Sequence, residues 1–260
     1  MKFQIERWDP STMLKEHRKV LYVGRSGSGK SVAMRAVLRS MPTVDLAIGF
    51  TPTDETYEEM RKIIPASCIH RELDLFVLDR CQHLQKELAH KNRAVCLIAD
   101  DCAYNKSMWR TNTMRSLFMN ARHNRISLHF SMQYLMDIDP SLRSNVDYVI
   151  ATAENIHANK QRLWKCFFGI FKTYSEFDQV FSQVTRDYAC IVLDQTQPSA
   201  SIENSVFWYK ADLTETAAPF KLGRSVYWRL DRNPPPQRKP SANVLTIEEA
   251  PPRRALVDAI

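Results

Sequence analysis

The residues best suited to chemistry lie in one short stretch near the start of the chain. Three of the six glycines and a Lys-Ser pair fit the spacing G-x-x-x-x-G-K-S across residues 24–31. An apolar run before this stretch predicts a strand, and the run after it predicts a helix. Glycines there let backbone N–H groups surround a phosphate, to which the helix N-terminus adds its positive dipole end. The sequence therefore predicts a phosphate-binding loop, in preference to a Gly/Ser-rich turn before a basic helix.

The side chains of this loop have separate predicted roles. Lys30 would reach the β- and γ-phosphates of a nucleotide, and Ser31 Oγ would ligate Mg²⁺. The expected cofactors are therefore ATP and Mg²⁺. The residues predicted to contact the nucleotide are Gly24, Arg25, Ser26, Gly27, Ser28, Gly29, Lys30, Ser31 and Val32.

A second signal is an apolar run, residues 94–99, about 70 residues after the loop. Such a run is typical of a strand buried on both faces of a parallel sheet. It ends in Asp100 and Asp101. Asp100 is predicted to hold Mg²⁺, and Asp101 to polarise the attacking water. Two acids can also simply end a strand, but the phosphate-binding loop upstream favours the metal-binding interpretation.

Three further residues carry weaker signals. Gln133 follows an alternating strand pattern over residues 126–132, where an amide could sense the γ-phosphate and align the water. Arg122 precedes that strand and Arg143 follows it. An arginine that crosses a subunit interface stabilises charge on the γ-phosphoryl group and accelerates its transfer by about 10³- to 10⁵-fold. A single arginine is more often a solvated surface residue. Spacing alone therefore does not show whether Arg122 or Arg143 has this role.

The elements that would position these residues alternate along the chain, which predicts an α/β fold with a mostly parallel sheet. In the stretch 73–90, the residues Leu73, Phe76, Val77, Leu84 and Leu88 recur at helical spacing. Apolar runs predict strands at 20–23, 44–50, 68–70, 94–99, 126–132, 147–151, 187–194 and 206–210. Helical periodicity predicts helices at 31–40, 55–63, 73–90, 107–121, 155–167 and 174–184.

Composition limits the class of protein. The chain has 260 residues, of which 44% are hydrophobic and 25% charged, as in ordinary globular proteins with a large core. Its net charge of +7 predicts attraction to nucleic acid or to an anionic membrane surface. The six cysteines show no C-x-x-C spacing, and no apolar run reaches transmembrane length. We expect an N-terminal arm at 1–17, a P-loop domain at 18–212 and a basic, Pro-rich tail at 213–260 that is partly extended or disordered.

Five segments of the chain, taken in order, resemble the motifs of the virion DNA-packaging ATPases of large nucleocytoplasmic DNA viruses and related virophages. They are GRSGSGKS, CLIADD, Ala121-Arg122-His123, ISLHFSMQ and PSLRSN, within about residues 18 to 210. These enzymes belong to the FtsK–HerA class of P-loop ring motors. The resemblance implies an additional-strand P-loop fold, in which another strand lies between the P-loop strand and the strand of Asp100, with helices on both faces of the sheet. It matches Gln133 to the sensor position, and it favours Arg122 over Arg143 as the trans-acting arginine finger.

The resemblance also implies a function. The protein would be an ATP-hydrolysing translocase that feeds double-stranded DNA through a homo-oligomeric ring of five or six subunits into a preformed capsid. Its partners would be DNA, further copies of the chain and capsid proteins, at virus assembly sites in the host cytoplasm or in the virion rather than outside the cell. One departure is Asp101, where many relatives of the broader class carry Glu. Candidate DNA contacts are Tyr104, Asn105, Lys106, Trp109, Arg110, Lys160, Arg162, Lys165 and Lys172.

Two alternatives remain open at this point. A P-loop nucleotide kinase would transfer phosphate to a nucleoside or nucleotide instead of water. A nucleotide-binding assembly protein would use ATP only as a structural switch, without multiple turnover. The sequence argues against a GTPase because N-K-x-D is absent, and against an ABC-type transporter subunit because L-S-G-G-Q is absent.

Overall fold

The computed structural model describes residues 4–102, 107–133, 139–198 and 201–232. Its centre is a nine-stranded sheet with the strand order β1-β9-β8-β7-β2-β6-β5-β3-β4. Among the described strands, only β8 runs antiparallel to its two neighbours, so the predicted α/β fold with a mostly parallel sheet is confirmed. The strands are β1 (Glu6–Arg7), β2 (Lys19–Val23), β3 (Leu46–Phe50), β4 (Ile69–His70), β5 (Val95–Ala99), β6 (Ile126–Met132), β7 (Tyr148–Ala151), β8 (Cys190–Asp194) and β9 (Val206–Tyr209).

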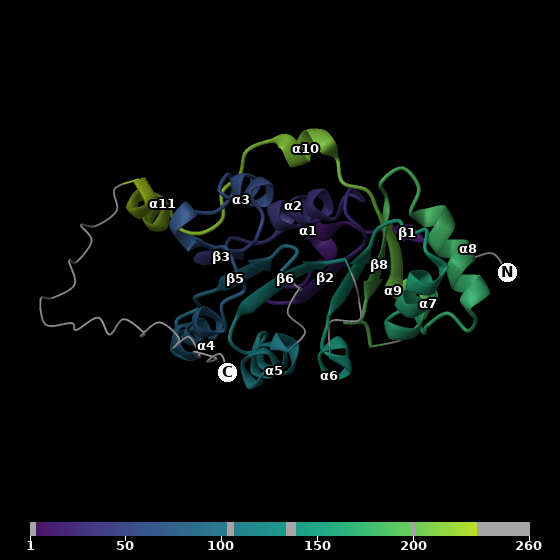
Figure 1. Cartoon of the computed structure of the whole chain (residues 1–260), viewed down its shortest axis with the longest axis horizontal. Helices are drawn as coiled ribbons and strands as arrows, with labels where there is room; N and C mark the ends of the chain where they lie inside the picture. The colour runs from purple at the N-terminus through teal and green to yellow at the C-terminus, as the bar shows by residue number, and fades with distance from the viewer. Residues whose placement is uncertain (1–3, 103–106, 134–138, 199–200, 233–260) are drawn as a thin grey trace, which may run out of the picture.

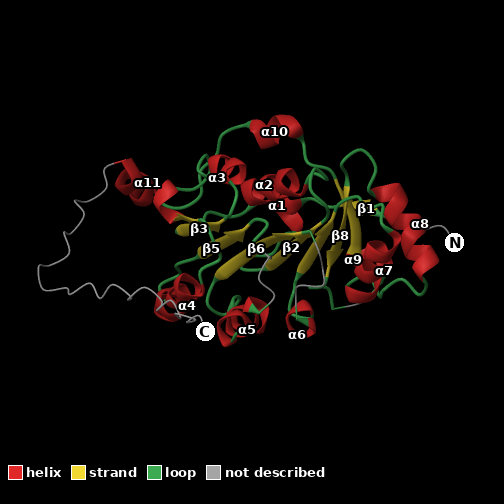
Figure 2. Ribbon diagram, in the orientation of Figure 1, coloured by secondary structure: helices red, strands yellow, loops and turns green. Residues whose placement is uncertain are grey.

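Helices cover both faces of the sheet (Figures 1 and 2). On one face lie α2 (Lys30–Ser40), α3 (Asp54–Met60) and α10 (Leu213–Ala217), and on the other lie α4 (Leu75–Ala89), α5 (Asn112–Asn120) and α6 (Pro140–Arg143). None of the described helices is both long and apolar enough to span a membrane. The remaining helices are α1 (Pro10–Met13), α7 (His157–Cys166), α8 (Tyr174–Val184), α9 (Ile202–Ser205) and α11 (Ser225–Arg232), with short 3₁₀ turns at Ala66–Cys68 and Met108–Arg110.

The sheet divides the apolar core into two clusters. Successive residues of a strand point to opposite faces. In β5, Leu97 therefore joins the cluster that includes Phe118 of α5, while Cys96 and Ile98 join the cluster that includes Val37 of α2. Every residue of β5 is buried, as the continuous apolar run predicts for a strand covered on both sides.

The strand β6 lies between β2 and β5. Its register pairs Val23 of β2 with Met132, and Ala99 of β5 with Phe130, so all three strands run parallel and end at one edge of the sheet. This is the additional-strand arrangement, and the prediction of a further strand between the P-loop strand and the Asp100 strand is confirmed. The described residues that directly follow β2, β5 and β6 consequently lie at the same edge.

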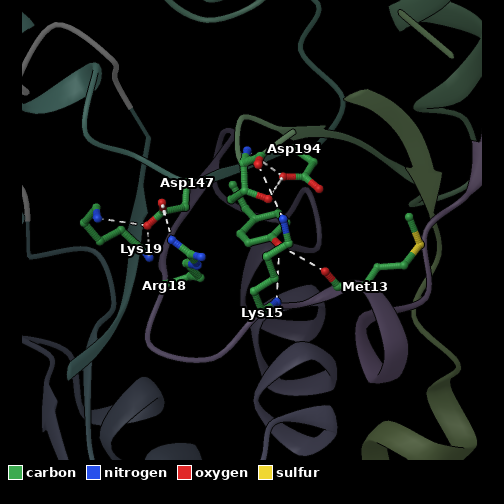
Figure 3. Close-up of polar contacts among 8 residues, drawn as sticks. Met13, Lys15, Arg18, Lys19, Asp147 and Asp194 are labelled. Atoms are coloured by element: carbon green, nitrogen blue, oxygen red, sulfur yellow. Dashed lines mark hydrogen bonds and ion pairs between the residues drawn. The ribbon is translucent and has the colours of Figure 1, made fainter. Parts of the chain in front are cut away.

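The N-terminal segment is tied to the same sheet. The strand β1 pairs with β9 in parallel and extends the sheet by one strand. Tyr148 Oη donates to the Met13 carbonyl at 3.0 Å and accepts from the Lys15 backbone N–H at 3.2 Å (Figure 3). The Lys19 ammonium lies 2.9 Å from Asp147 Oδ2. These contacts fix the path of the chain as it enters β2 and then the phosphate-binding loop.

The helix predicted at 73–90 exists as Leu75–Ala89, but its buried face differs from the apolar periodicity. Phe76 is 71% exposed, and Leu84 and Leu88 are exposed as well. The buried positions include Gln82 and Gln85, whose side-chain amides donate to backbone carbonyls. These hydrogen bonds pair the two amide nitrogens, while both amide oxygens are buried without a partner among the described residues. The pairing offsets part of the cost of burying the glutamines, so polarity in the sequence misidentifies the inner face.

Two further predicted boundaries change. The strand predicted at 187–194 begins only at Cys190, because Asp187 and Tyr188 have positive φ angles of 50° and 63° and form a turn. Within the predicted tail, residues 213–232 pack on the body: Arg39 donates to the Ala218 carbonyl at 2.7 Å, and the Leu222 N–H donates to the Ile63 carbonyl at 2.8 Å. Residues 233–260 of that tail lie outside the described residues.

Candidate active site

The loop between β2 and α2 requires glycine at two positions. Gly29, the N-cap of α2, has a φ of 92°, which L-residues with a side chain rarely adopt. At Gly24, an added Cβ would lie 1.8 Å from Thr152 Oγ1. That threonine hydroxyl donates to the Val23 carbonyl at 3.2 Å and lies 2.6 Å from Ser28 Oγ. The loop is therefore held closely against the end of β7.

Two side chains at the start of α2 point into this site. Lys30 is buried, and its ammonium donates to the Arg25 carbonyl of the loop at 3.1 Å. Ser31 Oγ donates to Asp100 Oδ2 at 3.1 Å, which joins the start of α2 to the end of β5. The lysine charge and the helix N-terminus both favour an anion in the loop.

Asp100 is only 2% exposed and is held on both carboxylate oxygens. Ser131 Oγ donates to Oδ1 and Ser31 Oγ to Oδ2. Burial raises the pKa of Asp100 above its usual value, and the charge of the neighbouring Asp101 adds to this effect, while the two serine hydrogen bonds and the Lys30 ammonium oppose it. The cluster presents hard oxygen donors, which suit Mg²⁺.

Asp101 and Gln133 meet across the ends of β5 and β6. Gln133 Nε2 donates to Asp101 Oδ2 at 3.2 Å. The Asp101 backbone N–H donates to Ser131 Oγ at 3.1 Å, and its φ of 52° turns the chain away from the strand. Asp101 Oδ1 is buried and has no hydrogen-bond partner among the residues that the structure describes. A buried carboxylate oxygen without a partner is costly unless water or a ligand binds there, so the site fits a water or a hydrated Mg²⁺ ion beside Asp100.

The two predicted arginines lie away from this group. Arg122 is exposed and precedes β6, so it lies near the amino end of that strand, opposite the phosphate-binding loop. It lines an open cleft of about 700 Å³ together with Lys86, His123 and Arg125, and none of the described residues that line this cleft is Asp or Glu. Arg143 is half-buried and its guanidinium donates to Cys166 Sγ of α7. The structure thus brings Lys30, Ser31, Asp100, Asp101 and Gln133 together and leaves both arginines outside.

Sequence reasoning missed two residues of the site. Ser131 holds Asp100 and accepts from Asp101, and Thr152 fastens the loop to β7. The signal for Ser131 was present, because it stands two residues before Gln133 on the same face of a strand. Thr152 directly follows a strand, but nothing local shows that this strand lies beside β2.

The predicted DNA contacts divide into four groups. Tyr104, Asn105 and Lys106 lie outside the described residues. Trp109 is only 1% exposed, so its prediction as a DNA contact is wrong: it packs against Phe118 and Phe130. Lys160 pairs with Asp178. The exposed candidates are Arg110, Arg162, Lys165 and Lys172.

Comparison with known proteins gives relatives from large DNA viruses. The uncharacterized protein 015R of Frog virus 3 (isolate Goorha) is 30% identical over 217 residues, which cover 81% of this chain and 66% of that protein. The uncharacterized protein L437 of Acanthamoeba polyphaga mimivirus is 26% identical over 222 residues, covering 81% of this chain and 78% of that protein. The chain thus spans slightly less than two thirds of the Frog virus 3 relative. No protein-family model matches the chain.

Among solved structures, the chain is similar to the genome packaging NTPase B204 of Sulfolobus turreted icosahedral virus 2 in complex with AMPPCP. The TM-score is 0.54 at 16% identity, and the match covers 79% of this chain and all of that one. The same NTPase has also been solved with ATP-gammaS. At this level of identity the likeness shows the fold alone, in agreement with the strand order described above.

Proposed function

We propose that this protein hydrolyses ATP and uses the energy to move double-stranded DNA into preformed viral capsids. The observation that carries the proposal is the convergence of Lys30, Ser31, Asp100, Asp101 and Gln133 at one edge of an additional-strand sheet. The fold shared with a genome packaging NTPase and the relatives in large DNA viruses support the DNA-packaging part.

Each residue has a role in hydrolysis under this proposal. Lys30 balances the charge of the β- and γ-phosphates. Ser31 and Asp100 would hold Mg²⁺, which when bound neutralises charge on the phosphate oxygens. Asp101 polarises the attacking water, and Gln133 fixes the Asp101 carboxylate and aligns the water with the γ-phosphate. Ser131 holds Asp100 in place, and so acts as a positioning residue.

The proposed active site is completed by a second copy of the chain. Arg122 is exposed near the amino end of β6, whereas the phosphate-binding loop lies at the carboxyl end of β2, so an arginine at this position serves a neighbour's site more readily than its own. The basic cleft around Arg122 offers positive charge for a triphosphate. Head-to-tail contacts form a closed ring when the rotation between neighbouring subunits closes, and we propose such a ring of five or six subunits. DNA and capsid proteins are the other proposed partners, at virus assembly sites in the host cell or in the virion.

The decisive experiment measures ATP hydrolysis with and without linear double-stranded DNA, on protein whose mass in solution is known. We expect DNA to stimulate the rate, and we expect Lys30→Ala and Asp100→Asn to abolish it. Lys62→Ala, an exposed lysine on the surface, is the matched control. Full activity of either site variant would contradict the proposal. Phosphate transfer to a nucleoside would point to a kinase, and ATP binding without turnover on any DNA would point to a structural switch.

A further inference from the structure

Tyr188 is an exposed aromatic residue that lies directly beside the phosphate-binding loop. Its side chain is 73% exposed, whereas most of the large aromatic side chains belong to the core. A Cβ placed on Gly29 would lie 3.5 Å from Tyr188 Cδ1 and 3.9 Å from Tyr188 Cβ. The ring therefore lies next to the position that a side chain at Gly29 would occupy, although the two residues are far apart in the sequence.

The backbone at Tyr188 is strained, and packing does not account for it. The Arg186 carbonyl accepts from the Ala189 N–H at 2.9 Å, and the two residues between them, Asp187 and Tyr188, both have positive φ. This is the pattern of a type I′ turn, whose second central position favours glycine. Tyrosine is unfavourable at this position because its side chain makes positive φ costly. Its ring is exposed, so burial of apolar surface offsets little of that free-energy cost. Strained non-glycine residues of this kind cluster at ligand sites.

The position of Tyr188 agrees with the direction in which a bound nucleotide must extend. The residues for metal and water follow β5 and β6, on one side of the loop strand β2. A terminal phosphate bound beside these residues would direct the base toward the other side of β2, where β7 and β8 follow. Because Ala151 of β7 pairs with Ile191 of the antiparallel β8, the turn before β8 reaches the same edge as the loop. Tyr188 lies in that turn.

We propose that Tyr188 forms the base-binding subsite, stacking its ring on the purine of the nucleotide whose phosphates occupy the loop. This inference rests on the proposed nucleotide-binding function and adds the residue that holds the base. Stacking uses the π-face that all bases share, so Tyr188 strengthens binding of ATP and GTP alike and does not select between them.

The test compares ATP with inorganic triphosphate, which has the phosphates but no base. Titration calorimetry with Mg²⁺ measures both affinities for the wild type, Tyr188→Ala, Tyr188→Gly and Tyr188→Phe. We expect Tyr188→Ala and Tyr188→Gly to weaken ATP about 5- to 150-fold, as for loss of one base–aromatic stack, and to leave triphosphate affinity unchanged. Tyr188→Phe keeps the ring and should bind ATP like the wild type. Tyr188→Gly removes the strain as well, so it should also melt at a higher temperature.

Each outcome decides the matter. Unchanged ATP affinity in Tyr188→Ala would overturn the base subsite while leaving the proposed function intact. Equal weakening of ATP and triphosphate would overturn it too, because Tyr188 would then only support the loop. Failure of the wild type to bind either ligand would overturn the nucleotide-binding function itself, together with its subsite.

Discussion

The side-chain amide of Gln133 donates to Asp101 Oδ2 at 3.2 Å, across 32 residues of sequence. The contact exists because β6 lies next to β5 and both strands end at the same edge. It occupies one oxygen of the carboxylate and leaves the other, Oδ1, buried without a partner among the described residues. The glutamine therefore orients the very group that we propose to polarise water, and its effect on catalysis should pass through Asp101.

We expect Gln133→Ala to lower kcat by about 10²-fold, since it releases a general base from its orientation, with little change in the KM for ATP. Steady-state hydrolysis measures this. The matched control is Gln179→Ala, which removes an exposed glutamine from α8. Because the two residues act as one unit, Asp101→Asn combined with Gln133→Ala should be no worse than Asp101→Asn alone. Independent, additive losses would contradict this coupling.

We expect Ser131→Ala to raise the Mg²⁺ concentration needed for half-maximal hydrolysis by about 10- to 100-fold. This is the effect of losing a group that orients a metal ligand. The hydroxyl it removes donates to Asp100 and accepts from the Asp101 N–H. Titration of the hydrolysis rate with Mg²⁺ at saturating ATP gives the midpoint. Ser127→Ala is the control, because Ser127 is equally buried in β6 but lies near its amino end. A midpoint unchanged in Ser131→Ala would exclude the positioning role.

The sequence predicted those site residues that stand in short motifs or directly at the end of a recognisable strand. Lys30, Ser31, Asp100 and Asp101 stand in motifs with fixed spacing next to apolar runs, and Gln133 ends a strand of clear alternation. The parallel strands then bring them together without further information. The fold class followed from the same alternation of strands and helices.

What escaped prediction depends on contacts between distant segments. A serine within an alternating strand reads as an outward-facing polar residue, but β6 is covered on both faces and Ser131 points at Asp100. The buried face of α4 was predicted wrongly because Gln82 and Gln85 are buried, where their amide nitrogens donate to backbone carbonyls. Tyr188 lay within a run that reads as strand, and only its φ of 63° reveals the turn beside the loop.

The stability of the protein should depend on His129 below neutral pH. This residue is 1% exposed within β6, its Nδ1 lies 3.0 Å from Tyr22 Oη, and burial lowers its pKa to about 3. Between the unfolded value of about 6.5 and the folded value, the unfolded state binds one more proton, so the free energy of unfolding falls as pH falls. The loss is about 1.4 kcal/mol per pH unit across this window.

Replacing the imidazole isolates this effect. His129→Gln keeps a hydrogen-bonding side chain but does not titrate. Its free energy of unfolding should therefore fall less than that of the wild type between pH 6.5 and 4.5, by about 2.3 kcal/mol, because the unfolded imidazole is already half protonated at pH 6.5. Urea unfolding at each pH measures the free energy of unfolding of both proteins. The pH dependence that comes from their shared carboxylates is the same in both, so it cancels in the difference. Parallel slopes would mean that His129 is protonated in the folded protein.

The final prediction concerns the arginine supplied by a neighbour. We expect Arg122→Ala to retain ATP binding and assembly but to lose about 10³- to 10⁵-fold in kcat. The matched control is Arg115→Ala, which removes an exposed arginine from α5, the helix that ends just before Arg122. Arg143→Ala should act differently, because its guanidinium is half-buried against Cys166 and its loss should lower stability as well.

Mixing two inactive variants separates action in trans from action within one chain. Arg122→Ala subunits keep an intact loop, and Lys30→Ala subunits keep an intact arginine. In a randomly mixed ring at equal amounts, about one quarter of the interfaces join an intact loop to an intact arginine, so hydrolysis should recover to that fraction of the wild-type rate if the sites turn over independently. No recovery, with mixed rings confirmed by native mass spectrometry, would exclude Arg122 as a trans-acting group. Recovery with Arg143→Ala but not with Arg122→Ala would transfer the role to Arg143.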